Sequence, residues 1–153
     1  MTVSVSFVIP SKNRPKGIRQ AVNSVLKGLP SDGEIVVIDD GSEQPLRGII
    51  ADFKDNRLKC FENPGPHGPS AARNYGVSLA QSDLIMFLDD DDLLVEDYCA
   101  RVVARLKNLP SDCSFGFSTS YILEPNSSMR LEQSASPEGV LGEETQLKFR
   151  QAG

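Results

Sequence analysis

Leu84-Ile85-Met86-Phe87-Leu88-Asp89-Asp90-Asp91-Asp92 is the stretch of this sequence that indicates most about the fold. Five apolar residues in a row predict a strand buried on both faces of a parallel sheet, because such strands lose the usual alternation with polar residues. Four carboxylates follow at once, and because they repel one another a divalent cation is their natural partner. Oxygen ligands favour magnesium, manganese or calcium over zinc. Ligands gather at the carboxyl ends of strands in open α/β sheets, so the stretch predicts a metal site there. The alternative is a solvated acidic turn in which Asp92 is the N-cap of the next helix.

Patterns typical of strands and helices alternate through the first 123 residues. The predicted strands cover residues 5–9, 35–38, 58–61, 84–88 and 115–123. The predicted helices cover residues 18–26, 46–53, 71–79 and 95–109, with Ser70 as the N-cap of the third and Pro110 ending the last. This alternation indicates an α/β fold with a mainly parallel central sheet and right-handed crossovers. From residue 124 the chain is polar and interrupted by serine, proline and glycine, so loop or a partly ordered tail is expected over 124–153.

Length and composition describe one acidic domain. The 153 residues carry a formal net charge of -5, which argues against a nucleic-acid partner held by bulk electrostatics. Cys60, Cys99 and Cys113 lack zinc-ligand spacing and are odd in number, so a reducing, cytoplasmic compartment is expected rather than a disulfide framework. No membrane span is predicted, because no run approaches the roughly 20 apolar residues that a bilayer requires.

A second pair of carboxylates follows the strand predicted over residues 35–38. In Asp39-Asp40-Gly41-Ser42, the carboxylates can accept hydrogen bonds from a base or from ribose hydroxyls, and Gly41 permits a sharp turn. An ordinary Asx turn is the alternative. Because two strand ends carry acids, the sequence predicts one shared cleft.

Four basic residues lie near the predicted strand ends or the glycine-rich loop, where they could neutralise a diphosphate. They are Lys12, Arg14, Lys16 and Arg73. Arg73 is favoured because it falls in the first turn of a predicted helix, whose N-terminus attracts anions. Solvated surface cations are the alternative, above all for Lys16. The single His67 stands in a proline-rich loop with no second ligand residue beside it, so no ligand or base role is predicted for it.

Four motifs, taken together and in this order, resemble family 2 glycosyltransferases. They are VSFVIPSKNR at 5–14, EIVVIDDGS at 34–42, GPSAARNYG at 68–76 and FLDDDD at 87–92. The resemblance covers about residues 3–123, the donor-binding half of that family. It implies the GT-A fold, which is the Rossmann-like fold of nucleotide-diphospho-sugar transferases. It also implies a metal-dependent transfer, with inversion, from a UDP-linked sugar to a saccharide or glycolipid acceptor.

The same resemblance implies a role for each motif residue. Pro10 and Ser11 would line the nucleoside pocket, Asp40 would accept a hydrogen bond from the base, and Asp39 would support its turn. Asp91 and Asp89 would hold Mn²⁺ or Mg²⁺, with Asp89 or Asp90 toward the ribose or a metal-bound water. The further substrate-binding residues that it implies are Asn13, Arg14, Gly68, Arg73 and Asn74.

Two departures from the family pattern leave questions open. Lys12 stands where the family often has tyrosine, so the preferred base is open. No acid can be matched to the family's general base, although several follow the last predicted strand: Glu124, Glu132, Glu138, Glu143 and Glu144. The chain thus resembles a donor-binding core at 1–123 whose acceptor half is missing.

The leading hypothesis is therefore a cytoplasmic glycosyltransferase, and self-association into a homodimer is compatible with it. One alternative is a nucleotide-sugar binding module without transferase activity. Another is a sugar nucleotidyltransferase, but that class normally has a glycine-rich N-terminal loop, and the loop from Pro10 to Gly17 has one glycine.

Overall fold

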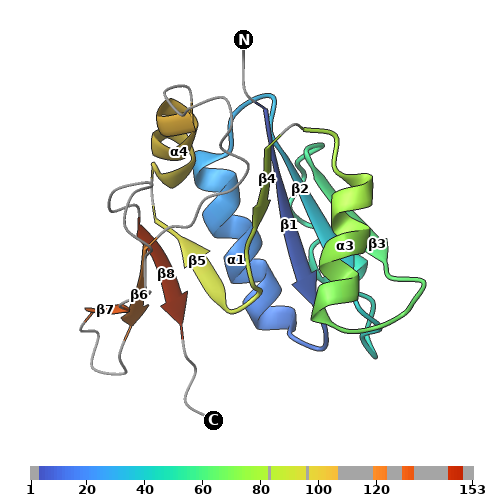
Figure 1. Ribbon diagram of the computed structural model, residues 1–153. Coiled ribbons are helices and arrows are strands. Elements are labelled where there is room, and N and C mark those ends of the chain that lie inside the picture. Colours follow the sequence, from blue (N-terminus) through green and yellow to red (C-terminus); the bar gives the residue numbers. More distant parts are fainter. Residues whose placement is uncertain are drawn as a thin grey trace.

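The computed structural model of the chain describes residues 4–82, 84–95, 97–106, 119–123, 129–132 and 145–149. Its first sheet has the strand order β3-β2-β1-β4 (Figure 1). The four strands are β1 (Val5–Ser11), β2 (Glu34–Asp39), β3 (Leu58–Glu62) and β4 (Leu84–Phe87). All neighbouring pairs are parallel, which confirms the predicted α/β class with a mainly parallel central sheet.

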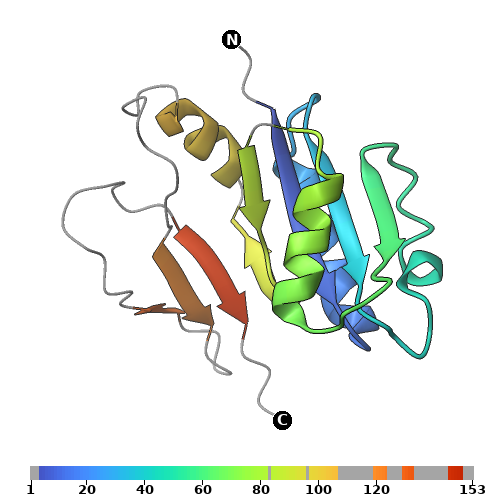
Figure 2. The same ribbon diagram turned by 45° about the vertical axis from the view of Figure 1, so that its right-hand side comes forward.

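Helices cover both faces of this sheet, with α3 (Pro69–Leu79) in front of it and α1 (Pro15–Gly28) behind it in Figure 2. Side chains of a strand alternate between the two faces. Accordingly Phe7 and Ile9 of β1 pack in the cluster that holds α1, whereas Val8 packs in the cluster that holds Ala72 of α3. Because both faces are covered, β1 and β2 are buried along almost their whole length.

The close approach of α3 to the sheet depends on a glycine. A Cβ built on Gly76 would lie 2.3 Å from Cγ1 of Val8, so no larger residue fits without displacement of the helix or the strand. The first turn of α3 also differs from the prediction, because the N-cap is Gly68 and not Ser70. Pro69 occupies the first helical position, where it has no amide hydrogen to leave unsatisfied and its φ already suits a helix.

The strand that carries the acidic residues lies at an edge of the first sheet. The prediction that it is buried on both faces is wrong, since the residues of β4 are half-buried and Phe87 is 48% exposed. Within the described residues β4 pairs with β1 alone in this sheet. Apolar composition therefore indicated the strand but not its position in the sheet.

Asp92 does not cap a helix. It is buried and opens the short strand β5 (Asp92–Leu94), and α4 (Tyr98–Leu106) begins four residues after β5 ends. Both Leu94 and Tyr98 are buried in the cluster that includes α1. The helical spacing that predicted a start near Val95 therefore extended across a turn in which Asp97 has a positive φ of 66°.

A second sheet has the strand order β5-β8-β6-β7. Its last three strands are β6 (Thr119–Leu123), β7 (Met129–Glu132) and β8 (Thr145–Phe149). β6 agrees with part of the strand predicted over 115–123, whereas β7 and β8 lie where loop was expected. The domain boundary at residue 123 stays a prediction, and this sheet contains strands from both sides of it. The rest of 107–153 lies outside the described residues.

One further helix is shorter than predicted. The helix α2 (Leu46–Ile49) covers only the first half of the predicted segment 46–53. None of the helices in the described ranges has the length and hydropathy that a membrane crossing needs.

Candidate functional site

The carboxyl ends of β1, β2 and β4 lie together at the lower end of the sheet in Figure 1. Ser11, the last residue of β1, joins the other two. Its carbonyl oxygen accepts a hydrogen bond from the amide of Asp40, with an N–O distance of 2.9 Å. Its hydroxyl donates to Oδ2 of Asp90 over 2.6 Å. The predicted acids after two strands therefore meet at one place, around the end of a third.

β1 does not stop at residue 9 as predicted but continues through Pro10, because the missing amide of Pro10 faces a side on which the described residues place no strand partner. The carbonyl of Val8 accepts a hydrogen bond from the amide of Leu88, just after the end of β4. Pro10 faces the same side as Val8, since backbone groups alternate along a strand. β4 has ended there, so Pro10 is tolerated and β1 carries Ser11 to the site.

Asp89, Asp90 and Asp91 form a tight turn, which we call the acidic turn. The amide of Asp92 closes it by donating to the carbonyl of Asp89 over 3.0 Å. The three carboxylates differ in environment: Asp90 is buried, whereas the side chains of Asp89 and Asp91 are 47% and 50% exposed. The four aspartates of the sequence motif therefore cannot share one function.

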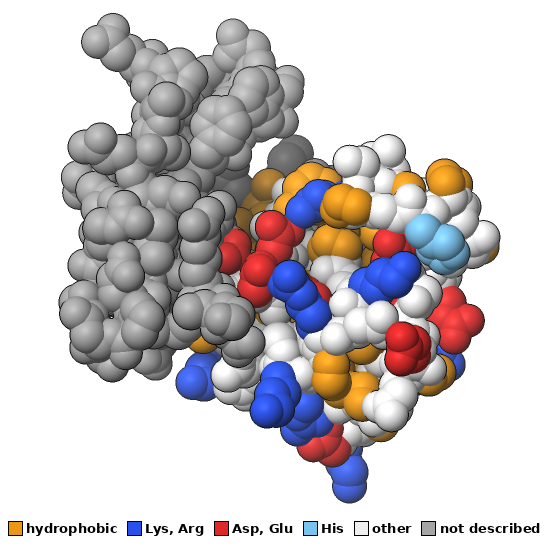
Figure 3. All heavy atoms as spheres, turned by 90° about the horizontal axis from the view of Figure 1, so that it is seen from below, with side chains coloured by type: hydrophobic (Ala, Val, Ile, Leu, Met, Phe, Trp, Pro, Cys, Tyr) orange, Lys and Arg blue, Asp and Glu red, His pale blue; other side chains and the backbone are white. Residues whose placement is uncertain are grey.

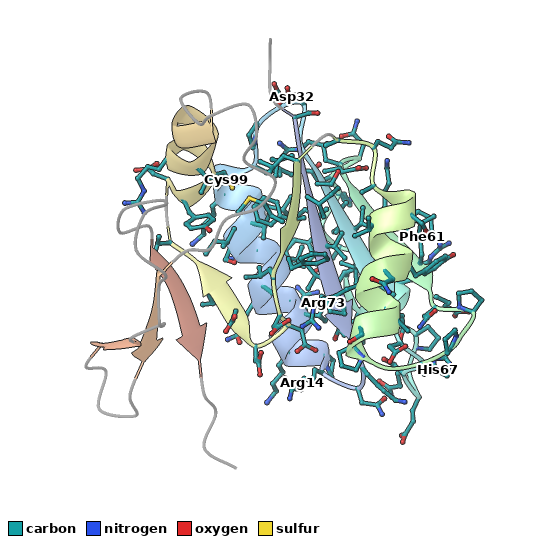
Figure 4. All side chains as sticks on the ribbon, in the orientation of Figure 1. Arg14, Asp32, Phe61, His67, Arg73 and Cys99 are labelled. Atoms are coloured by element: carbon teal, nitrogen blue, oxygen red, sulfur yellow. The ribbon has the colours of Figure 1, made fainter. Side chains whose placement is uncertain are left out.

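Two arginines form ion pairs with the acidic turn, and both lie at this end of the sheet in Figure 4. Nη1 of Arg14 contacts Oδ1 of Asp90 at 3.0 Å and Oδ2 of Asp91 at 2.8 Å. Nη2 of Arg73, in α3, contacts Oδ1 of Asp89 at 2.5 Å. The sequence predicted a cation as the partner of these carboxylates, and the two arginines of the chain already balance part of their negative charge.

The acidic turn packs directly against the first turn of α1. A Cβ on Gly17 would lie 2.5 Å from the carbonyl oxygen of Asp90, so only glycine permits this contact. Burial raises the pKa of Asp90, and the repulsion from Asp91 adds to it. The hydrogen bond from Ser11 and the charge of Arg14 lower this pKa, but they do not outweigh burial.

The other pair of carboxylates divides into a structural and a site-facing residue. Asp39 accepts hydrogen bonds from the amides of Ser42 and Leu46, each over 2.9 Å, and so holds both the turn after β2 and the start of α2. Asp40 instead points toward the loop after β3. Burial acts to raise the pKa of Asp40, but hydrogen bonds from Asn63, the Gly68 amide and His67 lower it below its ordinary value.

Asn63 and His67 belong to this network, although sequence reasoning assigned them no role. Nδ2 of Asn63 donates to Oδ1 of Asp40 over 2.7 Å, and Nδ1 of His67 lies 3.2 Å from the same oxygen. The ring of His67 also stands over Gly41, where a Cβ would be 3.4 Å from Cε1. The position of Asn63 in the sequence could have indicated its role, because Asn63 directly follows β3 and neighbouring parallel strands end at the same edge of the sheet.

The remaining predicted residues are placed unequally. Asn13, with a φ of 55°, links two loops by donating its amide to Oγ of Ser42 over 2.9 Å and accepting the amide of Glu43 over 2.8 Å. Gly68 donates its amide to Oδ2 of Asp40 over 2.7 Å. Asn74 is exposed on α3, and the described contacts do not link its side chain to the other site residues. Lys12 and Lys16 are exposed as well.

The described residues contain no cluster of three or more His, Cys, Asp or Glu side chains that could enclose a metal ion. Asp89 and Asp91 each offer a half-exposed carboxylate on the acidic turn, which is the kind of ligand that a hard cation takes. Magnesium typically takes one or two protein carboxylates and completes its shell with water and substrate phosphates. Of the acids considered as a general base, Glu132 lies in β7 and the other four lie outside the described residues.

Seen from the carboxyl ends of the strands, this face carries acidic and basic side chains beside one another, with the histidine at one side (Figure 3). Such a surface offers cationic groups for an anionic ligand and carboxylates for a metal ion or hydroxyl groups. A phosphorylated ligand that carries hydroxyl groups and binds together with a hard cation would use both the cationic groups and the carboxylates.

Comparison with known proteins gives this arrangement a context. A family model described as "Glycosyl transferase family 2" matches residues 6–152. An uncharacterized glycosyltransferase of Haemophilus influenzae is 39% identical over 95 residues, which are 61% of this chain and 38% of that protein. The Escherichia coli protein named UDP-Glc:alpha-D-GlcNAc-diphosphoundecaprenol beta-1,3-glucosyltransferase WfgD is 31% identical over 123 residues, 80% of this chain and 48% of that one. The chain thus spans less than half the length of these relatives.

Among solved structures, residues 1–349 of S. aureus TarS superpose with a TM-score of 0.66 at 23% identity. The superposition covers 92% of this chain and 39% of TarS 1–349. This likeness concerns the fold. The same TarS fragment has also been solved in complex with UDP-GlcNAc.

Proposed function

Because the chain belongs to glycosyl transferase family 2, we propose that it binds a nucleotide-diphosphate sugar and transfers the sugar to a saccharide or glycolipid acceptor. A UDP-linked donor is supported by two of the similar proteins. The E. coli relative is named for transfer from UDP-Glc to a diphosphoundecaprenol-linked acceptor, and the TarS fragment was solved with UDP-GlcNAc.

One observation carries this proposal: Ser11 connects the nucleoside side of the site to its acidic side. Through its carbonyl it holds Asp40, and through its hydroxyl it holds Asp90. A nucleotide-diphosphate sugar has the same sequence of parts, with a base and ribose at one end and charged phosphates followed by the sugar at the other. The two ends of such a ligand match the two halves of the site.

Each part of the site would then have a distinct task. Asp40 would accept a hydrogen bond from the base, with its carboxylate oriented by Asn63 and the Gly68 amide. Arg14 and Arg73 would supply positive charge for the diphosphate. The half-buried position of Arg73, with 31% of its side chain exposed, limits its loss of side-chain freedom on binding.

Asp91 and Asp89 would hold Mn²⁺ or Mg²⁺, as their exposed carboxylates on one turn allow. A bound divalent cation supplies a positive charge that stabilises the diphosphate as it leaves the sugar. The residues of this chain would orient the donor, whereas the group that deprotonates the acceptor remains unassigned. Two further parts of the proposal have separate grounds: inverting displacement follows from the family resemblance, and action in the cytoplasm follows from the cysteine content of the sequence.

Titration of UDP into the protein tests the donor site. We expect UDP to bind in the presence of Mn²⁺ and to bind at least about tenfold more weakly with a chelator, as for a coupled pair of ligands. Asp91→Asn should remove most of this dependence. Asp32→Asn is the matched control, since Asp32 is exposed at the opposite end of the sheet (Figure 4).

Equal UDP binding with Mn²⁺ and with chelator, or an unchanged metal dependence in Asp91→Asn, would contradict the proposed metal site. Transfer from UDP-glucose or UDP-GlcNAc is measured separately. A protein that binds donor tightly but neither transfers nor hydrolyses it would be a binding module instead.

A further inference from the structure

Arg14 holds two carboxylates of the acidic turn with a single nitrogen. Its Nη1 lies 3.0 Å from Oδ1 of Asp90 and 2.8 Å from Oδ2 of Asp91. Arg14 occupies the N-cap position of α1 immediately before Pro15, and its side chain is 55% exposed. The helix therefore fixes the backbone of Arg14, whereas the guanidinium group at the end of its side chain is accessible to a ligand.

The two carboxylates depend on Arg14 to different degrees. Asp90 has a side chain only 9% exposed, and besides Arg14 it has the hydroxyl of Ser11 as a donor. Removing positive charge from a buried carboxylate is costly, so Arg14 is held more firmly at Asp90. Asp91 is half exposed, and an ion pair in such a position contributes little. The contact with Asp91 is the one that can be given up.

Arg14 also has donors to spare. A guanidinium carries five N–H groups in a planar fork, and the contacts with both acids are made through Nη1. Its other nitrogens can bind a second anion while Nη1 stays on Asp90. A divalent cation at Asp91 would repel the guanidinium, whereas a diphosphate at the same place would attract it.

We propose that Arg14 couples cation binding to diphosphate binding by exchanging partners. Without ligand, Arg14 occupies Asp91 and weakens the affinity of the acidic turn for a cation alone. When the diphosphate arrives, Arg14 remains on Asp90, releases Asp91 to the cation and donates to a phosphate oxygen. Cation and diphosphate then strengthen each other's binding by the same factor, as linkage requires. This inference rests on the proposed donor site and adds that the cation binds tightly only together with the diphosphate.

Calorimetric titration of Mn²⁺, with and without saturating UDP, tests the exchange in three variants of the chain. In the unmodified protein UDP should increase the Mn²⁺ affinity by roughly tenfold or more. Arg14→Gln should bind Mn²⁺ alone more tightly than the unmodified protein does, and UDP should then add less. A variant that gains affinity for one ligand cannot be explained by a loss of structure.

Two further variants separate the exchange from a general effect of charge. Lys16→Gln removes one positive charge from the same exposed end of α1, where the described residues show no ion pair with the acidic turn, so it should behave like the unmodified protein. Arg14→Lys keeps the charge but loses the planar fork. It should therefore bind Mn²⁺ alone as weakly as the unmodified protein and gain less from UDP.

The inference is overturned if Mn²⁺ and UDP bind but Arg14→Gln leaves both the Mn²⁺ affinity and its enhancement by UDP unchanged. It is also overturned if Lys16→Gln has the same effect as Arg14→Gln. Failure of UDP to bind any variant, with or without Mn²⁺, would contradict the proposed function itself.

Discussion

At the scale of single residues, Asn63 shows how a side chain outside the sequence motifs can determine the state of one within them. It donates to Asp40 and to the carbonyl of Pro66, and its own Oδ1 accepts the amide of Gly65 over 3.1 Å. Asn63 therefore holds the loop after β3 against the end of β2. Without its amide group, Asp40 would have fewer donors for a carboxylate that is almost fully buried.

Asn63→Asp replaces this donor with a second carboxylate 2.7 Å from the first. We expect it to lower the free energy of unfolding by about 1–3 kcal/mol at pH 7, because a buried group loses its partner. The folded-state pKa of Asp40 lies below its ordinary 3.8. Charged Asp40 therefore stabilises the folded protein above about pH 4, and this stabilisation is lost as the pH falls through the folded-state pKa. In the variant we expect repulsion between the two carboxylates to raise the folded-state pKa of the pair, so that the folded variant gains stability relative to the unfolded chain as the pH falls through this raised pKa.

The difference between the unmodified protein and Asn63→Asp should therefore shrink as the pH falls from 7. Above about pH 4 protonation of the carboxyl pair relieves the variant, and below about pH 4 the unmodified protein loses the stabilisation from charged Asp40. Urea unfolding at pH 3.5, 5 and 7 measures this difference. Asn56→Asp, at an exposed position in the turn before β3, is the matched control and should change stability little at any pH. A loss that stays constant with pH would show that repulsion at Asp40 is not its cause.

At the scale of helices and strands, local sequence patterns predicted an element correctly where the element packs one regular face against its neighbours. The apolar runs of β1 and β2 and the helical spacing of α1 were sufficient, because each element buries a regular face. The start of α3 was misplaced, since the absent amide of Pro69 shifts the cap to Gly68. Edge position, the second sheet and the start of α4 depend on partners distant in sequence, which no local pattern contains.

The packing of α3 gives a test at this scale. Gly76→Ala places a Cβ 2.3 Å from Cγ1 of Val8 and 3.2 Å from Cγ1 of Ile38. We expect a loss of about 1–3 kcal/mol in the free energy of unfolding, as for overpacked cores. Gly48→Ala is the control, because a Cβ there meets nothing within 4 Å, and it should leave stability unchanged or slightly increase it.

Chemical denaturation of the two alanine variants under identical conditions measures this difference. If Gly76→Ala and Gly48→Ala were equally stable, α3 could move away from β1 without cost. Arg73 would then not be held rigidly beside Asp89.

At the scale of the whole molecule, the site is an assembly of strand ends. The meeting of its acidic residues could be predicted from the sequence, because parallel strands end at the same edge and Asp39-Asp40 and Asp89-Asp90-Asp91 each follow an apolar run. Its internal contacts could not. The ion pairs of Arg14 with Asp90 and Asp91, and of Arg73 with Asp89, join residues 16 to 77 positions apart and exist only in the folded chain.

The central claim is that the carboxyl edge of the first sheet binds a metal ion and a nucleoside diphosphate together. Its most direct test is a crystal structure of the protein with Mn²⁺ and UDP, in which anomalous scattering locates the manganese. We expect manganese beside Asp91 and Asp89, in contact with the diphosphate, and uracil near Asp40. UDP bound at this edge without manganese at the acidic turn, or bound away from it, would contradict the claim.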